Sequence, residues 1–498
     1  MTTEDSEAPV TGLRGAWAGR TPSTIAVVWD RPENRRDGTF RVLVDGEVVG
    51  TTPATDYTVT GLTPGTTYRI GVERVGSAAD PEWVEVATPA EPRRLDVTEF
   101  GAVGDGRAVN TTAIQRALDE ARHGPVVVYV PAGRYVTGAL DLHSDTTLEL
   151  AADATLVGSD DLADYPVRRH RWEGRERDCF ASLLNTPDPA PGERLHDITI
   201  RGAGTIDANG VVLRRQELAA ADRAMPGRAI CLRHVDRAYL FGVTVRQSPA
   251  WCVHVIYCAE VTLNQVAIHT KYDEHGVAYE GIGNGDGFDP DSTSRVDVIR
   301  SVIASQDDCI AIKSGRDEAG RAVGIPSEHV RVTNCRFPSG FGVAVGSEMS
   351  GGVRDVLVQD CVFDNTFSCA TVKAPRGRGG VVENIRYLDL VHHNIGTEHK
   401  DCRWFRGAIN IDQFYSHEEF DPHAPRPVTD ATPVIRDVTL RNIVSDTVAG
   451  RAVFLAGLPE QPLERIRMEN VRATGRAGLR AHNVAGLDLT DTCVTTSE

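Results

Sequence analysis

A short sequence template recurs from about residue 95 onward, and it constrains the fold of this chain more than any other feature. Each copy has two apolar residues two positions apart, then Asn, Asp or a small residue, and then apolar residues in the opposite phase. The clearest copies are VRVTNCRF (330–337), VLVQDCVF (356–363), IRYLDLVH (385–392), VTLRNIVS (438–445) and IRMENVRA (466–473), and looser copies begin at Ile198, Ala238, Val261 and Val296.

Each copy of the template predicts two strands joined by a sharp corner. Period-two alternation is typical of a strand, and the phase switch indicates a corner at which Asn tolerates left-handed backbone. Neighbouring copies stand about 23 to 53 residues apart, as between 238 and 261 or between 385 and 438. Coils of this length with variable loops stack into a parallel β-helix around a continuous core. The sequence therefore predicts an all-β solenoid.

Two of the ten cysteines occupy apolar positions of the template. Cys335 and Cys361 stand where other copies have Leu390, Ile443 and Val471. Ten cysteines in 498 residues are too few for a disulfide scaffold, and no Cys-x-x-Cys pair occurs. We expect these thiols to fill the core rather than to bind a metal or form disulfides.

The start of the solenoid region predicts a capping helix. In the stretch 100–121, Asn110 precedes an amphipathic run in which Ile114, Leu118 and Ala121 share one face. Asn is a favoured residue at a helix N-cap. A helix here would cover the open end of the solenoid.

Residues 9–88 follow a different pattern and predict a small antiparallel β-sandwich. Short alternating runs are separated by Gly, Pro and Asp turns, including an Asp-Gly turn at 45–46. Trp29, together with Tyr68 just after a Pro-Gly turn, resembles the fibronectin type III module. We expect residues 88–94 to be a linker and residues 95–498 to form the solenoid domain.

The charge of the chain disfavours binding to polyanions. Its 53 Lys and Arg residues stand against 70 Asp and Glu residues, which gives a net charge of −17. Such a field repels nucleic acid and anionic membranes. No stretch approaches the ~20 apolar residues of a membrane span. The acidic N-terminus lacks the features of a signal peptide, so we expect a cytoplasmic protein, or a secreted one if a leader was removed. The oligomeric state is not indicated.

Two acidic motifs provide the candidate catalytic residues. The motifs are GIGNGDGFDPDS (281–292), which contains Asp286, Asp289 and Asp291, and QDDCIAIKSG (306–315), which contains Asp307 and Asp308. Asp286 and Asp307 are 21 residues apart, close to one coil, and adjacent coils lie roughly 4.8 Å apart. Clustered carboxylates raise one another's pKa, which suits the paired acid and base of glycosidic hydrolysis. The alternative is that both motifs are ordinary turns.

A basic loop follows the acidic motifs. TVKAPRGRGG (371–380) contains Lys373, Arg376 and Arg378. A cationic loop on an acidic protein suggests recognition of a carboxylate-bearing ligand. The alternative is a solvated loop, or an ion pair with the acidic cluster. Lys313 and Arg316 are further candidates for the same face.

Residues 95–480 resemble the polygalacturonase family of glycoside hydrolases, family 28. The motifs that carry the resemblance are NGDGFDPDS (284–292), DDCIAIKSG (307–315), VGSEMSGGV (345–353) and KAPRGRGG (373–380). GALDLHSDTTLEL (138–150), SDDLADYP (159–166) and RQSPAWCVHVIYC (246–258) look like the bacterial, often exo-acting branch, in which fibronectin type III modules also occur. The resemblance implies a right-handed parallel β-helix that cleaves pectin with inversion and without a metal or other cofactor.

The resemblance also implies roles for individual residues. Asp307 would be the general acid, and Asp286 and Asp308 would together hold and deprotonate the attacking water. Asn284 would orient the site, and Lys373 would bind a uronate carboxylate. The other expected substrate-binding residues are Phe341, Glu348, Arg376 and Arg378.

Two motifs depart from the family pattern. Many polygalacturonases have Gly-His-Gly where this chain has Gly340-Phe341-Gly342, and Arg-Ile-Lys where it has Thr371-Val372-Lys373. The missing Arg normally grips the carboxylate of the leaving-side sugar, and such a charge-assisted contact contributes ~1.5–3 kcal/mol. Phe341 instead offers an apolar platform for a sugar face. A leaving-side sugar without a carboxylate, such as rhamnose, is therefore an alternative to galacturonate.

The sequence leaves three functions to compare. The favoured one is an inverting glycoside hydrolase that acts on pectic oligosaccharides from a chain end, either as a polygalacturonase or as a rhamnogalacturonan galacturonohydrolase. A carbohydrate-binding pseudoenzyme is the alternative from a different class, supported only by the two departures. A calcium-dependent polysaccharide lyase fits the aspartate trio poorly.

Overall fold

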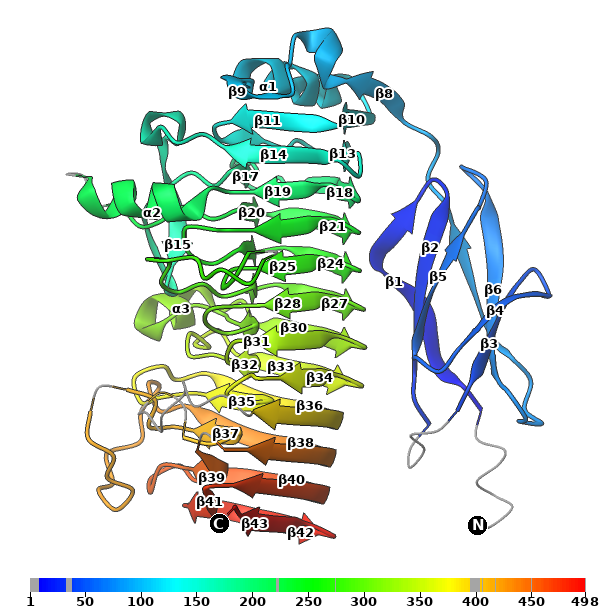
Figure 1. The fold of residues 1–498 in the computed structure, drawn as a ribbon. Helices are drawn as coiled ribbons and strands as arrows, with labels where there is room; N and C mark the ends of the chain where they lie inside the picture. Colours follow the sequence, from blue (N-terminus) through cyan, green and yellow to red (C-terminus); the bar gives the residue numbers. More distant parts are fainter. Residues whose placement is uncertain are drawn as a thin grey trace.

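A computed structural model describes residues 9–32, 38–220, 224–273, 275–394, 404, 406–416, 418–448 and 450–497. Residues from Arg93 onward form a parallel β-helix, and an antiparallel sandwich lies beside it (Figure 1). The all-β fold class expected from the repeats is confirmed.

Three ladders of parallel strands run along the solenoid. The first contains β8 (Arg93–Asp96), β10 (Val126–Val130), β13 (Thr146–Leu150), β18 (Leu195–Gly202), β21 (Val235–Phe241), β24 (Ala259–Asn264), β27 (Ser294–Ile299), β30 (Ser327–Thr333) and β33 (Val353–Gln359). The second contains β9 (Asp105–Val109), β11 (Gly133–Thr137), β14 (Ala154–Gly158), β19 (Thr205–Asp207), β22 (Thr244–Arg246), β25 (Ala267–His269), β28 (Val302–Ala304), β31 (Arg336–Ser339) and β34 (Val362–Asp364). The third, which carries the candidate site, contains β12 (Leu140–Asp141), β17 (Leu184–Asn185), β20 (Ile230–Arg233), β23 (Val253–Ile256), β26 (Phe288–Asp291), β29 (Ile310–Ile312), β32 (Val343–Val345), β35 (Ala370–Lys373), β37 (Ile409–Asp412), β39 (Arg451–Ala456) and β41 (Ala477–His482).

The template corners adopt the left-handed conformation that the sequence predicted. The corner residues have φ values of 55° at Asn334, 54° at Asp360, 56° at Asp389, 56° at Asn442 and 51° at Asn470. In the three coils before the last one, the corner lies inside one long strand that belongs to both ladders. These strands are β36 (Val381–Asn394), β38 (Val434–Thr447) and β40 (Leu463–Gly475), and the last coil ends with β42 (Val484–Thr490) and β43 (Cys493–Thr496). Side-chain amides connect successive corners, since Asn442 donates to Asp389 and Asn470 donates to Asn442, both at 2.8 Å.

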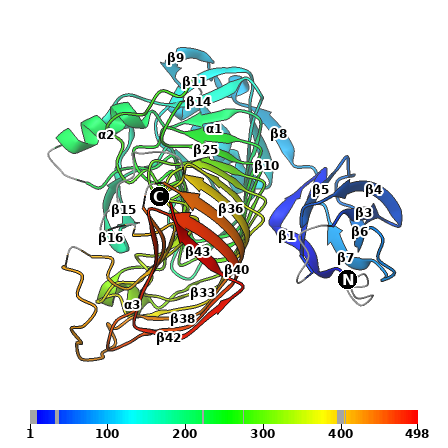
Figure 2. The same ribbon diagram turned by 60° about the horizontal axis from the view of Figure 1, so that its bottom comes forward.

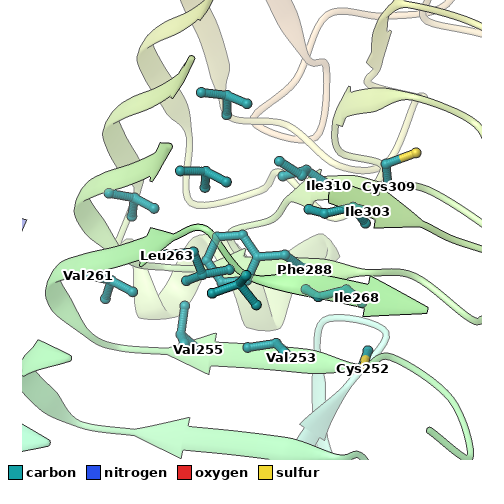
Figure 3. Packing of buried hydrophobic residues seen from close by; sticks show 14 of the residues in the cluster. Cys252, Val253, Val255, Val261, Leu263, Ile268, Phe288, Ile303, Cys309 and Ile310 are labelled. Carbon is teal, nitrogen blue, oxygen red and sulfur yellow. The ribbon is translucent and has the colours of Figure 1, made fainter. Parts of the chain in front are cut away.

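Apolar side chains from successive coils stack into one continuous core. Val253, Phe288 and Ile310 are register neighbours in the third ladder and point into the solenoid (Figure 3). Cys335 and Cys361 are both buried in this core as free thiols, which confirms the prediction that they fill apolar positions.

A helix covers the first coil, as predicted. α1 (Thr111–Asp119) lies at the end of the solenoid next to β9 and β11 (Figure 1), and Ile114 and Leu118 are fully buried against the core. Ala121 follows in the 3₁₀ turn Glu120–His123 and is also buried. The side chain of Asn110 does not cap the helix. It instead accepts a hydrogen bond from the Val103 amide at 2.7 Å and donates to Ala108 O at 2.6 Å. No helix in the described part of the chain is long and apolar enough to cross a membrane.

The N-terminal region is a sandwich of two antiparallel sheets. One sheet contains β1 (Thr11–Thr21), β2 (Thr24–Asp30) and β5 (Asp56–Thr60), and the other contains β4 (Glu47–Thr52), β3 (Phe40–Val44), β6 (Thr67–Arg74) and β7 (Glu82–Ala87). Trp29 packs edge-to-face on Phe40 between the sheets, with ring centroids 5.4 Å apart. The Tyr68 hydroxyl accepts a hydrogen bond from the Thr63 amide at 2.8 Å. The fibronectin type III assignment remains a prediction, and β8 begins at Arg93, inside the expected linker 88–94.

The sandwich packs against the first ladder through ion pairs, each with one buried or nearly buried partner. Arg14 donates two hydrogen bonds of 2.8 Å to Asp297 on β27, whose side chain is fully buried. Arg331 on β30 donates to Asp30 at 2.8 Å. Figures 1 and 2 both place the sandwich on the side of the solenoid opposite α3 (Asp317–Val323) and β15 (Val167–Trp172).

Replacing Asp297 by Ala should loosen this interface measurably. The change removes two charge-assisted hydrogen bonds, each of which contributes ~1.5–3 kcal/mol, and it leaves the Trp17 amide, which donates to Asp297 at 2.9 Å, without its acceptor. We expect the free energy of unfolding to fall by about 2–3 kcal/mol, measured by chemical denaturation. Asp178→Ala removes an exposed pair with Arg169 and should leave the denaturation midpoint unchanged. Equal effects of the two changes would contradict the structural role of Asp297.

Candidate active site

A pocket of about 920 Å³ lies over the middle coils of the third ladder, and every one of its lining residues comes from the solenoid. It contains all nine residues that the sequence predicted for the site. They are Asn284, Asp286, Asp307, Asp308, Phe341, Glu348, Lys373, Arg376 and Arg378.

The coil geometry brings the two acidic motifs together. Asp286 lies two residues before β26, and Asp307 and Asp308 precede β29 one coil further on. The Gly287 amide donates to Asp308 O at 2.9 Å, which places the two turns side by side. A Cβ at Gly287 would lie 2.3 Å from Ile303 Cγ2 and 2.5 Å from Cys309 O, so this position of the motif admits only glycine.

The three predicted catalytic carboxyl groups form one cluster. Carboxylate oxygens of Asp286, Asp307 and Asp308 all lie within 4.8 Å of one another. Burial, followed by the neighbouring carboxylates of Asp286 and Asp308, raises the pKa of Asp307 to about 8. Burial and the nearby Asp289 raise the pKa of Asp286 well above its ordinary value. A protonated acid beside an ionised carboxylate is therefore available at neutral pH.

Two buried lysines neutralise part of this negative charge. Lys373 Nζ lies 2.5 Å from Asp308 Oδ2, in a charge-assisted contact. Lys313 Nζ lies 3.4 Å from Asp286, 3.4 Å from Asp289 and 3.3 Å from Glu348. Lys313, which the sequence offered only as a candidate, thus lies at the centre of the site.

The two loop arginines line the pocket but bind protein groups. Arg376 forms a bidentate pair with Glu460 at 2.6 and 2.9 Å. Arg378 donates to Asp317 at 2.5 Å and to Ser347 O at 2.7 Å. The sequence raised an ion pair with the acidic cluster as an alternative to ligand binding. Both arginines do form ion pairs, but with Glu460 and Asp317 rather than with the aspartate cluster. The pairs fix the shape of the loop at the edge of the pocket.

The two motif departures have different structural consequences. The Phe341 amide donates to the backbone carbonyl of Asp307 at 3.0 Å, and Phe341 is one of the residues that line the pocket. Thr371 is fully buried, and its hydroxyl pairs with Ser368 at 2.7 Å. A short threonine in this position adds no cation to the pocket.

Sequence reasoning missed three aromatic residues of the site, and it named Asp289 without giving it a role. Lys313 Nζ lies 4.6 Å from the Trp251 ring centroid, and Lys373 Nζ lies 5.1 Å from that of Tyr415. Trp404 packs against Tyr415, with centroids 4.9 Å apart. Asp289 is fully buried beneath Lys313. Trp251 precedes β23, one coil before Asp286. This one-coil spacing was the sequence signal that could have placed Trp251 in the site.

The carboxylate cluster is also the set of groups in the pocket that could ligate a cation. Carboxylate oxygens suit Mg²⁺ or Ca²⁺. The ammonium groups of Lys313 and Lys373 already lie against these oxygens and oppose a divalent ion. A site without a metal remains our prediction.

Models of known protein families match most of the chain. The family model described as "Glycosyl hydrolases family 28" matches residues 126–493. A second model, "Rhamnogalacturonase A/epimerase, pectate lyase-like", matches residues 95–153.

Individual relatives agree with the family match. A "Probable polygalacturonase" of Vitis vinifera is 32% identical over 75% of this chain and 73% of the relative. An "Exo-poly-alpha-D-galacturonosidase" of Dickeya chrysanthemi is 28% identical over 72% of this chain and 63% of the relative. A family 28 exopolygalacturonase structure from Yersinia enterocolitica has a TM-score of 0.81 at 22% identity and covers 99% of both chains, which shows that the whole two-domain fold is shared.

Proposed function

Because the chain belongs to glycosyl hydrolases family 28, we propose that it hydrolyses galacturonide linkages of pectic oligosaccharides, beginning at a chain end. The observation that carries this proposal is the cluster of Asp286, Asp307 and Asp308 in one pocket. The printed names of the Vitis, Dickeya and Yersinia relatives support galacturonide as the substrate class and, for two of them, exo action.

In the proposed mechanism, the three aspartates divide two tasks. Asp307 donates its proton to the glycosidic oxygen as the bond from that oxygen to the anomeric carbon breaks. Asp308, which pairs with Lys373, accepts a proton from a water molecule whose oxygen attacks the anomeric carbon. Asp286 accepts the second hydrogen bond of that water and so orients it. One proton leaves Asp307 and one reaches Asp308, so the reaction is balanced.

The stereochemical outcome is proposed from the family and needs its own test. Inverting enzymes commonly hold the acid and base about 6.5–9.5 Å apart, whereas oxygens of this cluster lie within 4.8 Å of one another. The spacing alone therefore does not predict inversion. Proton NMR of the first product should show the inverted anomer before mutarotation. A retained anomer would mean that an aspartate, rather than water, attacks the anomeric carbon first.

The raised pKa of Asp307 predicts how activity responds to pH. Catalysis requires the protonated form of Asp307, whose pKa lies at about 8. We therefore expect kcat/KM to fall as the pH rises through about 8, with a tenfold loss for each further pH unit. A rate that stays constant up to pH 10 would show that another group is the acid.

Contacts on the α3 side of the pocket support action at a chain end. In the hairpin of β15 and β16 (Arg175–Phe180), the Gly174 carbonyl accepts a hydrogen bond from the Arg316 amide at 3.1 Å. Arg175 pairs with Asp317 at 2.7 Å, and Asp317 also accepts the 2.5 Å bond from Arg378. The hairpin, α3 and the 375–380 loop therefore form one connected wall, which favours substrates that end there.

A second candidate is a galacturonohydrolase whose leaving-side sugar carries no carboxylate. It is favoured by buried Thr371 and by Phe341, whose amide contacts Asp307, because neither side chain carries a cation that could bind a sugar carboxylate. A panel of defined oligogalacturonides and rhamnogalacturonan fragments tests both candidates. The first predicts stepwise release of one short uronide from oligogalacturonides, the second predicts faster cleavage when rhamnose follows the bond, and no turnover of any fragment would refute both.

A further inference from the structure

The active site contains more buried acids than cations. The buried acids around it are Asp286, Asp289, Asp308 and Glu348, beside the half-buried Asp307, and the ammonium groups between them belong to Lys313 and Lys373. Leaving buried carboxylates without a compensating cation is very costly. The cluster must therefore hold protons, and Asp307 accounts for one of them in the proposed mechanism.

The contacts of the other acids locate a second proton. Asp308 is paired with Lys373 at 2.5 Å. Glu348 accepts from the Ser347 hydroxyl at 2.9 Å in addition to its contact with Lys313. Asp286 and Asp289 are left to share the remaining contacts of the Lys313 ammonium, each at 3.4 Å.

Asp289 is the least satisfied of these groups. It is fully buried, and neither of its carboxylate oxygens accepts a hydrogen bond from any described residue. A proton on either carboxyl group would allow a hydrogen bond between Asp286 and Asp289. Burial raises the pKa of Asp289 to about 7, against the opposing effects of Lys313 and of that hydrogen bond.

The other polar groups packed around Asp289 do not replace this partner. On the preceding strand β23, His254 is its register neighbour but faces Asp291 at 3.4 Å. Burial lowers the pKa of His254 to about 4, which leaves the ring neutral. Buried Arg228 acts on Asp289 only through its charge and donates its hydrogen bond to Arg171 O. The Cys252 thiol stays neutral because burial raises its pKa.

We propose that Asp289 is a positioning residue that shares one proton with Asp286, so that the two carboxyl groups carry a single negative charge between them. The shared proton fixes the orientation of Asp286, whose other oxygen is then free to hold the water of the proposed hydrolysis. The inference rests on the proposed function only for that last role, because the shared proton itself is a property of the resting protein.

The proton can be counted without turnover. Infrared difference spectroscopy detects the carbonyl stretch of protonated carboxyl groups. At pH 6, Asp307→Asn should remove one such signal, and Asp289→Asn should remove or shift another. Burial raises the pKa of Glu217 to about 7 and that of Asp412 to about 6, so these two acids contribute signals of their own that both changes leave in place. Asp80→Asn, at an exposed position of the sandwich, should change no signal. If folded Asp289→Asn protein, or folded Asp286→Asn protein, keeps every signal of the unmodified protein unchanged, the proposal is wrong, so the test does not depend on whether one particular variant folds.

Kinetics then separate positioning from a merely structural role. Without its carboxyl neighbour, Asp286 ionises more easily, so in Asp289→Asn the acidic limb of kcat/KM should move to lower pH by about one unit. A structural role would lower kcat or the melting temperature and leave the limb in place, which would overturn the proposal. If the unmodified protein cleaves none of the pectic fragments, the proposed function is refuted. The infrared result would then still test the shared proton by itself.

Discussion

Asp307→Asn should lower kcat by about 10²–10⁴-fold, the usual contribution of a general acid, while substrate binding persists. The asparagine keeps the size and the hydrogen bonds of the aspartate but has no proton of suitable acidity to donate. Turnover should be measured on an oligogalacturonide, and the dissociation constant should be measured by calorimetry on the same fragment.

The control variant tests whether an Asp-to-Asn change far from the pocket affects turnover. Asp80→Asn makes the same chemical change on the exposed surface of the sandwich and should leave kcat unaltered. A carbohydrate-binding pseudoenzyme would show no turnover in either variant or in the unmodified chain. Full activity of Asp307→Asn would remove Asp307 from the mechanism.

Lys313→Met should be the most destabilising single change in the site. It removes the ammonium group shared by Asp286, Asp289 and Glu348 and leaves their carboxyl groups buried without that cation. Breaking a buried ion pair from one side costs about 3–5 kcal/mol, and we expect the free energy of unfolding at pH 8 to fall by this amount. Chemical denaturation at several pH values measures it.

The loss of unfolding free energy in Lys313→Met should grow as the pH rises. In the folded chain Asp289 and Asp307 keep protons up to pH values of about 7 and 8, whereas an unfolded aspartate releases its proton near 3.8. Folding therefore takes up protons between these limits, and the contribution of these groups to stability falls as the pH rises from about 4 to about 8. Lys313→Met steepens this fall, so its cost should be smaller at pH 5 than at pH 8.

The matched control is Lys271, which lies outside the catalytic cluster. Lys271 lies over the Tyr272 ring at 5.0 Å and does not line the pocket, so Lys271→Met should cost less than about 1 kcal/mol. A loss in Lys313→Met that is equally small, or one that does not change with pH, would mean that solvent already screens these carboxylates.

Much of the fold was accessible from the sequence because solenoids repeat. The corner residues Asn334, Asp360 and Asn442 were recognised by their phase switch, and all three have left-handed backbone. The same regularity placed Asp286 one coil before Asp307, and so predicted the carboxylate cluster. The capping helix was predicted too, although Asn110 uses its side chain to hold the preceding loop.

Features that depend on contacts between distant segments were not accessible. Arg376 and Glu460 are 84 residues apart, and nothing in either motif indicates that they pair. Asp289 resembled a turn residue, and only its complete burial beneath Lys313 shows its part in the site. The position of the sandwich depends on Arg14 and Asp297, which are 283 residues apart.

The central claim is that Asp286, Asp307 and Asp308 surround one glycosidic bond. A crystal structure of Asp307→Asn with a galacturonide trisaccharide tests it most directly. We predict that the side chain of residue 307 lies within hydrogen-bonding distance of a glycosidic oxygen, with a water molecule between Asp286 and Asp308 facing the adjoining anomeric carbon. A trisaccharide bound with no glycosidic oxygen near residue 307, or bound away from this pocket, would contradict the account.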